Sequence, residues 1–178
     1  MSRPRPAAFL DRDGVLNHDR GYVWNSKSFE WIDGAVETVR LLNERGFLVL
    51  VVTNQAGVAR GLYTERDVER LHRWMDRELG RWRARVDAYY FCPHHPTAGG
   101  GPYTRPCDCR KPAPGLLLRA MSEWPVDAAL SFLVGDHERD LAAAVAAGVP
   151  GHLFAGGDLL RFVVGILERQ DRVTGGGS

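Results

Sequence analysis

Two aspartates, Asp11 and Asp13, stand two positions apart directly after the short apolar run 7–10, and Gly14 follows them. Carboxylates this close repel one another and raise each other's pKa unless a cation lies among them. Their oxygens suit Mg²⁺, which completes its coordination with water and substrate oxygens. A carboxylate can also attack phosphorus and form an aspartyl phosphate that water then hydrolyses. The pair therefore predicts phosphoryl chemistry, with Asp11 as nucleophile and Asp13 as acid and base.

Three further polar residues come after other apolar runs of the chain. Thr53 follows the second run, Lys111 lies in the loop after the third, and Asp136 follows the fourth. Asp136 is a candidate second side-chain ligand for Mg²⁺. Lys111 and the Thr53 hydroxyl are candidate donors to phosphoryl oxygens, because lysine binds phosphate as a point charge. A single polar residue after a strand is usually an ordinary turn, but four in corresponding places indicate a shared site.

The cysteines of the chain form a second set. Cys92-x-His94 and Cys107-x-Cys109 together supply three sulfurs and one imidazole, a composition typical of a closed structural Zn²⁺ site. The alternative is three unrelated thiols, which this ligand spacing makes less plausible. Because four protein ligands leave no open position, we expect this metal to hold the loop in place rather than to take part in catalysis.

The elements that must position these residues alternate along the chain. Five short runs read as buried strands, and segments of helical spacing lie between them. The predicted strands are 7–10, 47–52, 88–91, 130–134 and, more weakly, 151–154. The predicted helices run from Ala35 to the stop at Gly46, from Thr64 to Trp82, and over 115–123, 139–147 and 158–168.

Strands that are apolar throughout, rather than in alternation, indicate a parallel sheet covered on both faces. The fold class predicted is α/β, a doubly wound parallel sheet with a minimal cap and a zinc-binding loop. In this architecture ligands bind outside the carboxyl ends of the strands, where the strand order reverses. The four polar strand ends should therefore meet there.

Length and composition fit one small enzyme domain. The chain has 178 residues, which suits a single domain, predicted over 1–172 with a flexible tail over 173–178. Lys plus Arg number 23 against 22 Asp plus Glu, so no overall charge favours nucleic acid or a membrane surface. No run has the length of a signal-peptide core or a transmembrane helix. We therefore expect a cytoplasmic protein with reduced cysteines and a small phosphorylated substrate as its partner.

The motifs resemble those of the haloacid dehalogenase (HAD) superfamily of phosphatases. They are Asp11-Arg12-Asp13-Gly14, Thr53-Asn54-Gln55, Arg110-Lys111-Pro112 and Gly135-Asp136-xxx-Asp140, in the order and separation of that superfamily. The resemblance implies the same roles for Asp11, Asp13, Thr53 and Lys111. It also implies that Mg²⁺ binds Asp11, the backbone carbonyl of Asp13, and Asp136.

Further segments resemble the branch of this superfamily that acts on heptose 1,7-bisphosphates. They include Gly21-Tyr22-Val23, Val52 to Gly61, Cys92-Pro93-His94-His95-Pro96 and the segment from Cys107 to Pro112. The resemblance implies a monomer without a large cap domain. It also implies substrate contacts at Asp19, Arg20, Gly21, Tyr22, Asn54, Gln55, Ala56, Arg110 and position 137. That branch commonly has lysine at position 137, whereas this chain has His137, which is only partly charged near neutral pH.

Three other interpretations are open at this point. A histidinol-phosphate phosphatase would share the four motifs and the zinc loop. A receiver domain of a signalling system would also combine acidic residues, Thr and Lys on a doubly wound sheet, but Asp13 and the zinc loop argue against it. A zinc-ribbon nucleic-acid module is disfavoured by the balanced charge and the single metal set.

Overall fold

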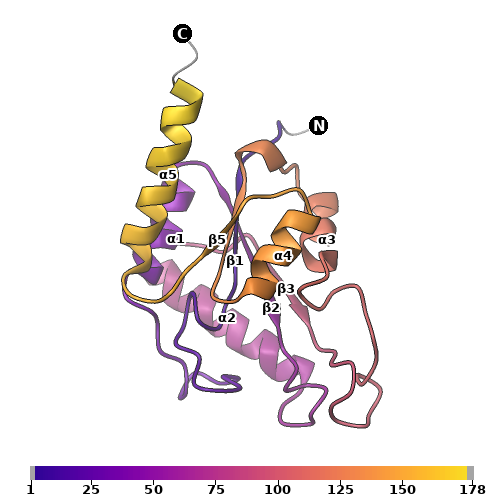
Figure 1. Ribbon diagram of the computed structural model, residues 1–178. Helices are drawn as coiled ribbons and strands as arrows, with labels where there is room; N and C mark the ends of the chain where they lie inside the picture. The colour runs from indigo at the N-terminus through magenta and orange to yellow at the C-terminus, as the bar shows by residue number, and fades with distance from the viewer. Residues whose placement is uncertain (1–2, 176–178) are drawn as a thin grey trace.

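The computed structural model describes residues 3–175 and contains one parallel sheet of five strands between two layers of helices (Figure 1). Its strands are β1 (Ala7–Leu10), β2 (Leu48–Asn54), β3 (Ala88–Cys92), β4 (Phe132–Gly135) and β5 (Gly151–Leu153). Its helices are α1 (Ala35–Glu44), α2 (Glu65–Arg81), α3 (Gly115–Glu123), α4 (Glu138–Ala146), α5 (Leu159–Gly175) and a short 3-10 turn, Ala128–Leu130. The predicted α/β class is confirmed.

The sheet has the strand order β3-β2-β1-β4-β5, so the chain turns from one half of the sheet to the other at β1. All four strand pairings are parallel, and Ala8 of β1 pairs with Val49 on one side and Phe132 on the other. The carboxyl end of β1 therefore lies at the switch point of a doubly wound sheet. Asp11 and Asp13 follow this strand directly.

The two faces of the sheet bury separate sets of apolar side chains. Leu10 and Val51 point to the face covered by α1, α2 and α5, whereas Phe9 and Leu50 point to the face covered by α3 and α4. Figure 1 shows these two helix layers on opposite sides of the strands. Burial on both faces explains why the strands are apolar at every position rather than at every second one.

The start of α2 confirms a signal that is legible in the sequence. The Thr64 hydroxyl accepts a hydrogen bond from the Asp67 backbone N–H at 3.3 Å, and the Asp67 carboxylate accepts one from the Thr64 backbone N–H at 2.9 Å. This reciprocal pair is a capping box, formed here with aspartate in place of the usual glutamate. It fixes the direction in which α2 leaves the loop that follows β2.

Several element boundaries differ from the prediction. β2 extends through Asn54, so Thr53 lies inside the strand rather than after it. Leu130 belongs to the 3-10 turn, and β4 begins only at Phe132. The last helix runs to Gly175 instead of ending near residue 168 and so includes the first residues of the predicted tail. The division into a domain over 1–172 and a flexible tail stays a prediction. Residues 176–178 of that predicted tail lie outside the described residues.

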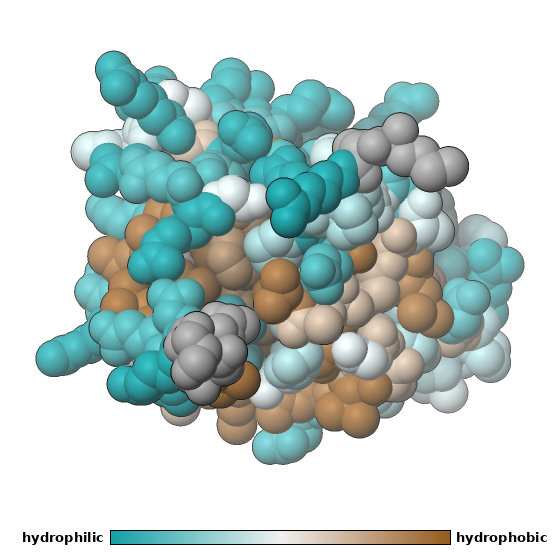
Figure 2. All heavy atoms as spheres, turned by 90° about the horizontal axis from the view of Figure 1, so that it is seen from above, coloured by the Kyte–Doolittle hydropathy of each residue, from teal (hydrophilic) through white to brown (hydrophobic). Residues whose placement is uncertain are grey.

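The surface at the amino ends of the strands carries apolar side chains (Figure 2). A groove of about 540 Å³ lies there, and its lining includes Phe47, Leu130, Pro150 and Ile166. Within residues 3–175 no helix is both long and apolar enough to cross a membrane. The polar strand ends all lie at the other end of the molecule.

Candidate active site

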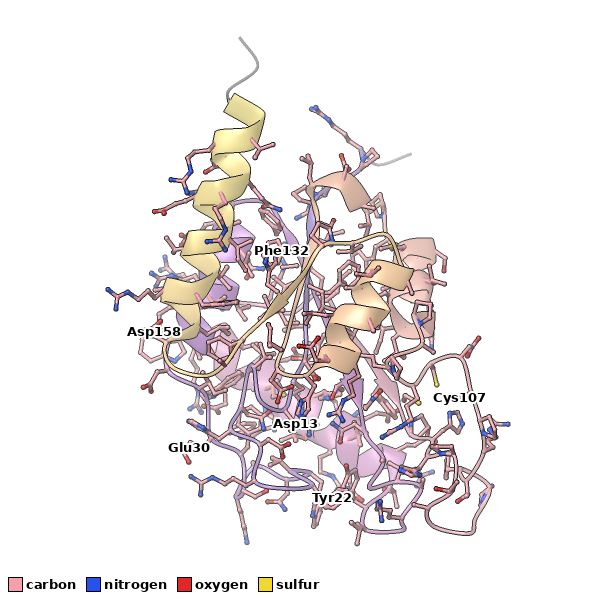
Figure 3. All side chains as sticks on the ribbon, viewed as in Figure 1. Asp13, Tyr22, Glu30, Cys107, Phe132 and Asp158 are labelled. Atoms are coloured by element: carbon pink, nitrogen blue, oxygen red, sulfur yellow. The ribbon has the colours of Figure 1, made fainter. Side chains whose placement is uncertain are left out.

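A cavity of about 240 Å³ opens at the carboxyl ends of β1 and β2. Asp11, Asp13 and Thr53 line it, as the strand-end argument predicts. Figure 3 shows Asp13 at this end of the sheet, with Tyr22 beyond it and Cys107 on the neighbouring loop. The residues that the sequence singled out from two separate strands thus share one cavity.

Asp11, Lys111 and Asp140 form a buried line of alternating charges. Lys111 Nζ lies 3.0 Å from Asp11 Oδ2 and 2.8 Å from Asp140 Oδ1. It also donates a hydrogen bond to the Val52 carbonyl at 2.9 Å. Burial raises the pKa of Asp11 to about 6, although the charge of Lys111 opposes that rise. The neighbouring carboxylates raise the pKa of Lys111 despite its burial, so the ammonium group stays charged.

The backbone of Lys111 is held by the side chain of Asn54. The Asn54 amide nitrogen donates to the Lys111 carbonyl at 3.1 Å, and its oxygen accepts from the Lys111 N–H at 3.0 Å. Asn54 is the last residue of β2, so this pair ties the loop after β3 to the sheet. The resemblance implied that Asn54 contacts substrate, but its amide forms both of these bonds with the backbone of Lys111.

Asp13 is surrounded by hydrogen-bond donors. Arg12 Nη2 lies 2.9 Å from Asp13 Oδ1 and 3.0 Å from Oδ2, and Asn17 Nδ2 donates to Oδ1 at 3.0 Å. The Arg12 side chain is fully buried and also donates to the Val23 carbonyl. Sequence reasoning gave Arg12 no role, and the structure makes it the cation that orients the Asp13 carboxylate.

Gln55 connects Asp13 with Thr53. Its amide nitrogen donates to Asp13 Oδ2 and to Thr53 Oγ1, both at 2.9 Å. The Tyr63 hydroxyl donates to Gln55 Oε1 at 2.7 Å and so fixes which end of the amide faces the two acceptors. Burial raises the pKa of Tyr63 to about 12, which keeps this donor protonated. Because Thr53 accepts from Gln55, its own hydroxyl hydrogen is free to turn toward the cavity.

Asp136 meets the loop of the two aspartates at Gly14. A Cβ atom at Gly14 would lie 2.0 Å from Asp136 Oδ2, and Gly14 has a φ of 84° that favours glycine. Oδ1 of Asp136 is buried and accepts no hydrogen bond from residues 3–175, although His137 Nδ1 lies 2.8 Å away. A buried carboxylate oxygen without a hydrogen bond, on a residue packed against the glycine that follows Asp13, fits the donor set that Mg²⁺ prefers.

The four predicted zinc ligands also come together. Ligand atoms of Cys92, His94, Cys107 and Cys109 all lie within 4.8 Å of one another. Cys92 Sγ is 3.6 Å from Cys107 Sγ and 3.7 Å from His94 Nδ1, and Cys109 Sγ is 3.3 Å from that nitrogen. Metal bonds of about 2.0–2.3 Å in a tetrahedron require separations of roughly this size. The residues therefore fit a Zn²⁺ ion, with Nδ1 as the histidine ligand atom.

Most of the predicted substrate contacts line the cavity. Those that do so are Asp19, Gly21, Tyr22, Asn54, Gln55, Ala56 and Arg110. Arg20 instead forms an exposed ion pair with Glu30, and His137 lies beside Asp136. Substrate contact at all of these positions, in the lining or outside it, stays a prediction.

The lining contains four further residues for which sequence reasoning proposed no role. They are Arg60, Tyr63, His95 and Arg139. Arg139 is in the first turn of α4, and Arg60 and Tyr63 are in the loop between β2 and α2. Arg60 and His95 lie in segments that resemble the heptose branch but were given no role, and no motif marks Tyr63 or Arg139, which only the fold brings to the cavity.

Comparison with known proteins identifies the family. The HAD-hydrolase-like family model matches residues 108–161. The chain is 46% identical to D-glycero-beta-D-manno-heptose-1,7-bisphosphate 7-phosphatase of Rhodopseudomonas palustris, over 96% of this chain and 94% of that protein. The chain belongs to the HAD phosphatases. It is also 48% identical to the protein of the same name from Escherichia coli (strain K12), over 84% of this chain and 78% of that one.

Solved structures of HAD phosphatases have the same fold. A D,D-heptose 1,7-bisphosphate phosphatase from B. bronchiseptica, complexed with magnesium and phosphate, gives a TM-score of 0.75 at 34% identity, covering 90% of this chain and 86% of that one. A HAD-like phosphatase from Mesorhizobium loti gives 0.81 at 32% identity, covering 88% and 76%. This HAD phosphatase is thus a phosphoric monoester hydrolase, and the cavity at the switch point is its candidate active site.

Proposed function

We propose that this phosphatase removes the 7-phosphate of D-glycero-β-D-manno-heptose 1,7-bisphosphate through an aspartyl-phosphate intermediate. One observation supports the reaction above all: a buried carboxylate, Asp11, lies 3.0 Å from the Lys111 ammonium beside a cavity that Asp13 and Thr53 also line. The sugar is supported by the name of the Rhodopseudomonas palustris relative, which matches along 96% of this chain.

In the first step Asp11 attacks phosphorus. A carboxylate oxygen of Asp11 forms a bond to phosphorus while the bond from phosphorus to the sugar oxygen breaks. Asp13 gives its proton to that departing oxygen, and the products are the free sugar hydroxyl and the phosphorylated Asp11. Lys111 and the Thr53 hydroxyl donate hydrogen bonds to the phosphoryl oxygens on which charge gathers.

In the second step water releases the phosphate. Asp13, now a carboxylate, takes a proton from a water molecule whose oxygen attacks phosphorus. The bond between phosphorus and Asp11 breaks, inorganic phosphate leaves, and both aspartates return to their starting state. The bonds from Arg12, Asn17 and Gln55 hold the Asp13 carboxylate at the edge of the cavity between these steps.

Asp11, the Asp13 backbone carbonyl and Asp136 would hold Mg²⁺, which when bound supplies positive charge to the phosphoryl oxygens. Support comes from the hydrogen-bond-free Asp136 Oδ1 and from the B. bronchiseptica structure, which contains magnesium and phosphate. Zn²⁺ on the cysteine and histidine set would fix the loop that leads into Arg110 and Lys111. We assign it a structural role.

The test is a comparison of kcat/KM, with Mg²⁺, for both anomers of the heptose bisphosphate, heptose 7-phosphate, histidinol phosphate and hexose phosphates. We expect the β-bisphosphate to be preferred. A preference for histidinol phosphate would replace the proposed substrate and leave the phosphatase chemistry in place. Inactivity toward every phosphate ester would contradict the proposed chemistry itself.

A further inference from the structure

Three arginines line the active-site cavity in addition to its aspartates. Arg60, Arg110 and Arg139 all line this cavity. They come from the loop after β2, the zinc loop and the first turn of α4, respectively. None of the three forms an ion pair with a carboxylate among residues 3–175. The cavity is therefore lined both by carboxylates and by three arginines that have no ion-pair partner among the described residues.

Two of the arginines lie near the same histidine, His95. The charges of both Arg60 and Arg110 act on His95, whose pKa is lowered by burial and by these two guanidinium groups. Arg60 also lies over the Tyr22 ring, with its guanidinium carbon 6.0 Å from the ring centroid. Arg110 donates a hydrogen bond to the His94 carbonyl at 3.3 Å. Both guanidinium groups are thus held near the cavity by contacts that leave their charge uncompensated.

From the start of α4 it is Arg139 that lines the cavity, and His137 does not. His137 Nδ1 is 2.8 Å from Asp136 Oδ1, so its ring faces the candidate magnesium ligand, and it is absent from the cavity lining. Arg139 is exposed and lines the cavity directly. At the start of α4, the residue that lines the cavity is therefore Arg139, two positions beyond position 137, which the family resemblance indicates.

We propose that Arg139, together with Arg60, binds the second phosphate of a bisphosphorylated sugar and so determines the preference of this enzyme for bisphosphates. Guanidinium groups bind phosphate through paired, charge-assisted hydrogen bonds. A dianionic group there would offset like charges that otherwise repel one another across the cavity. This inference rests on the proposed function, because it assumes a substrate with two phosphates.

The test measures how much the second phosphate of a sugar bisphosphate strengthens its binding to the enzyme. Hydrolysis of p-nitrophenyl phosphate is the assay. The inhibition constant of a sugar bisphosphate is compared with that of the monophosphate of the same sugar, once for a heptose pair and once for a fructose pair. In the wild-type enzyme we expect the bisphosphate to inhibit at a clearly lower concentration. In Arg139→Ala and in Arg60→Ala this advantage should fall by about 10–100-fold, the range for a charged hydrogen bond. Inhibition by the monophosphate should change less than about twofold.

Three comparison variants make the result specific. Arg66→Ala removes an exposed arginine of α2 outside the cavity and should change neither inhibition constant. Arg139→Lys should restore part of the lost advantage, because it keeps the charge without the planar fork. His137→Ala should weaken the inhibition by both members of a pair to the same extent.

The outcomes separate the two proposals. Two results would overturn the subsite. In one, Arg139→Ala leaves the ratio between bisphosphate and monophosphate inhibition unchanged. In the other, the variant weakens inhibition by the bisphosphate and by the matching monophosphate equally. If the arginine variants lose the advantage but the wild-type enzyme does not distinguish heptose from fructose, the subsite stands and only the assignment of heptose fails.

Discussion

The catalytic cavity and the zinc loop are neighbours in space, but their charged groups are arranged in different ways. In the cavity, Lys111 lies between the carboxylates of Asp11 and Asp140, so the chain itself supplies both signs of charge. In the zinc loop, the sulfurs of the three cysteines and the Nδ1 atom of His94 lie close together, and Arg105 contacts the other ring nitrogen of His94 at 3.0 Å.

This difference indicates what each region needs in order to stay folded. Deep burial of opposite charges can hold the catalytic residues in place before any ligand binds. Three thiols within hydrogen-bond distance cannot all ionise unless a cation joins them, so we expect the loop to depend on a metal ion for its order. Cys109, Arg110 and Lys111 are consecutive, so a loop that we expect a metal to stabilise delivers Lys111 to a site stabilised by ion pairs.

The strongest test of the catalytic half is Asp11→Asn. The variant keeps the size of the side chain and removes the nucleophile, so kcat should fall by about 10⁴-fold or more. Its fold should persist, because burial already disfavours the Asp11 charge, as the rise of its pKa to about 6 indicates. The measurement is phosphate release together with thermal unfolding. The exposed Asp33→Asn is the matched control and should retain full activity, and full activity of Asp11→Asn itself would refute the role of Asp11.

The strongest test of the zinc half is removal of its metal. Protein purified without chelators should contain about one zinc per chain. After chelation and return of Mg²⁺ alone, we expect kcat/KM to be lower by about 10–100-fold, since the support of Arg110 and Lys111 is lost. Added Zn²⁺ should restore it, and the far-ultraviolet circular dichroism should change little throughout. Absence of zinc in the purified protein would contradict the metal assignment.

The contribution of the buried Lys111 ion pairs to stability can be compared with that of an exposed ion pair. Asp140→Asn removes one of the two carboxylates from the buried Lys111, and we expect unfolding free energy to fall by about 1–3 kcal/mol and kcat by about tenfold or more. Glu44→Gln breaks the exposed pair with Arg40, whose atoms are 3.5 Å apart, and should cost less than about 0.5 kcal/mol. Denaturant unfolding measures both. Equal costs for the two variants would show that burial of the Lys111 cluster has no special importance.

The smallest expected effect is the contribution of one buried histidine, next to Arg12, to the pH dependence of stability. His72 is buried, stacks on Tyr89 at 4.3 Å and lies 3.5 Å from Arg12 Nη1. Burial, and then the charge of Arg12, lower its pKa well below the ordinary value, so the folded state keeps it neutral. The unfolded chain binds a proton below about pH 6.5 and the folded chain does not. His72 should therefore make unfolding free energy fall with decreasing pH, by up to about 1.4 kcal/mol per pH unit.

The variant His72→Phe keeps an aromatic ring beside Tyr89 and removes the titrating group. Between pH 5 and pH 6.5 its unfolding free energy should decrease less steeply than that of the wild type. Subtracting the two slopes removes the contribution of Asp11, whose raised pKa acts in the opposite direction. Parallel slopes would show that His72 does not contribute to the pH dependence.

Much of the fold could be predicted from the sequence because burial on both faces leaves the strands apolar at every position. β1 and α3 have the predicted limits. The end of α5 could not be predicted, because the segment after residue 168 is polar and lacks the apolar spacing that marks a helix. β2 was expected to end before Thr53, since polar residues after an apolar run resemble a loop.

Some residues of the candidate site could likewise be predicted from the sequence, and others could not. Asp11, Asp13, Thr53 and Lys111 could be predicted, because they lie at the ends of strands or in the loops that follow them and the architecture brings strand ends together. The partners of these residues could not be predicted. Arg12 is a buried cation in a loop, and Arg139 reaches the cavity from α4, so their positions depend on contacts between segments far apart in the chain.

The central claim is that Asp11 carries the phosphoryl group during turnover. The most direct measurement is acid quenching of the enzyme during hydrolysis of the heptose bisphosphate, followed by mass spectrometry of its peptides. We predict a phosphoryl adduct on the peptide that contains Asp11, lost in Asp11→Asn. Steady turnover in which no quenched sample contains this adduct, or in which it lies on another residue, would contradict the account.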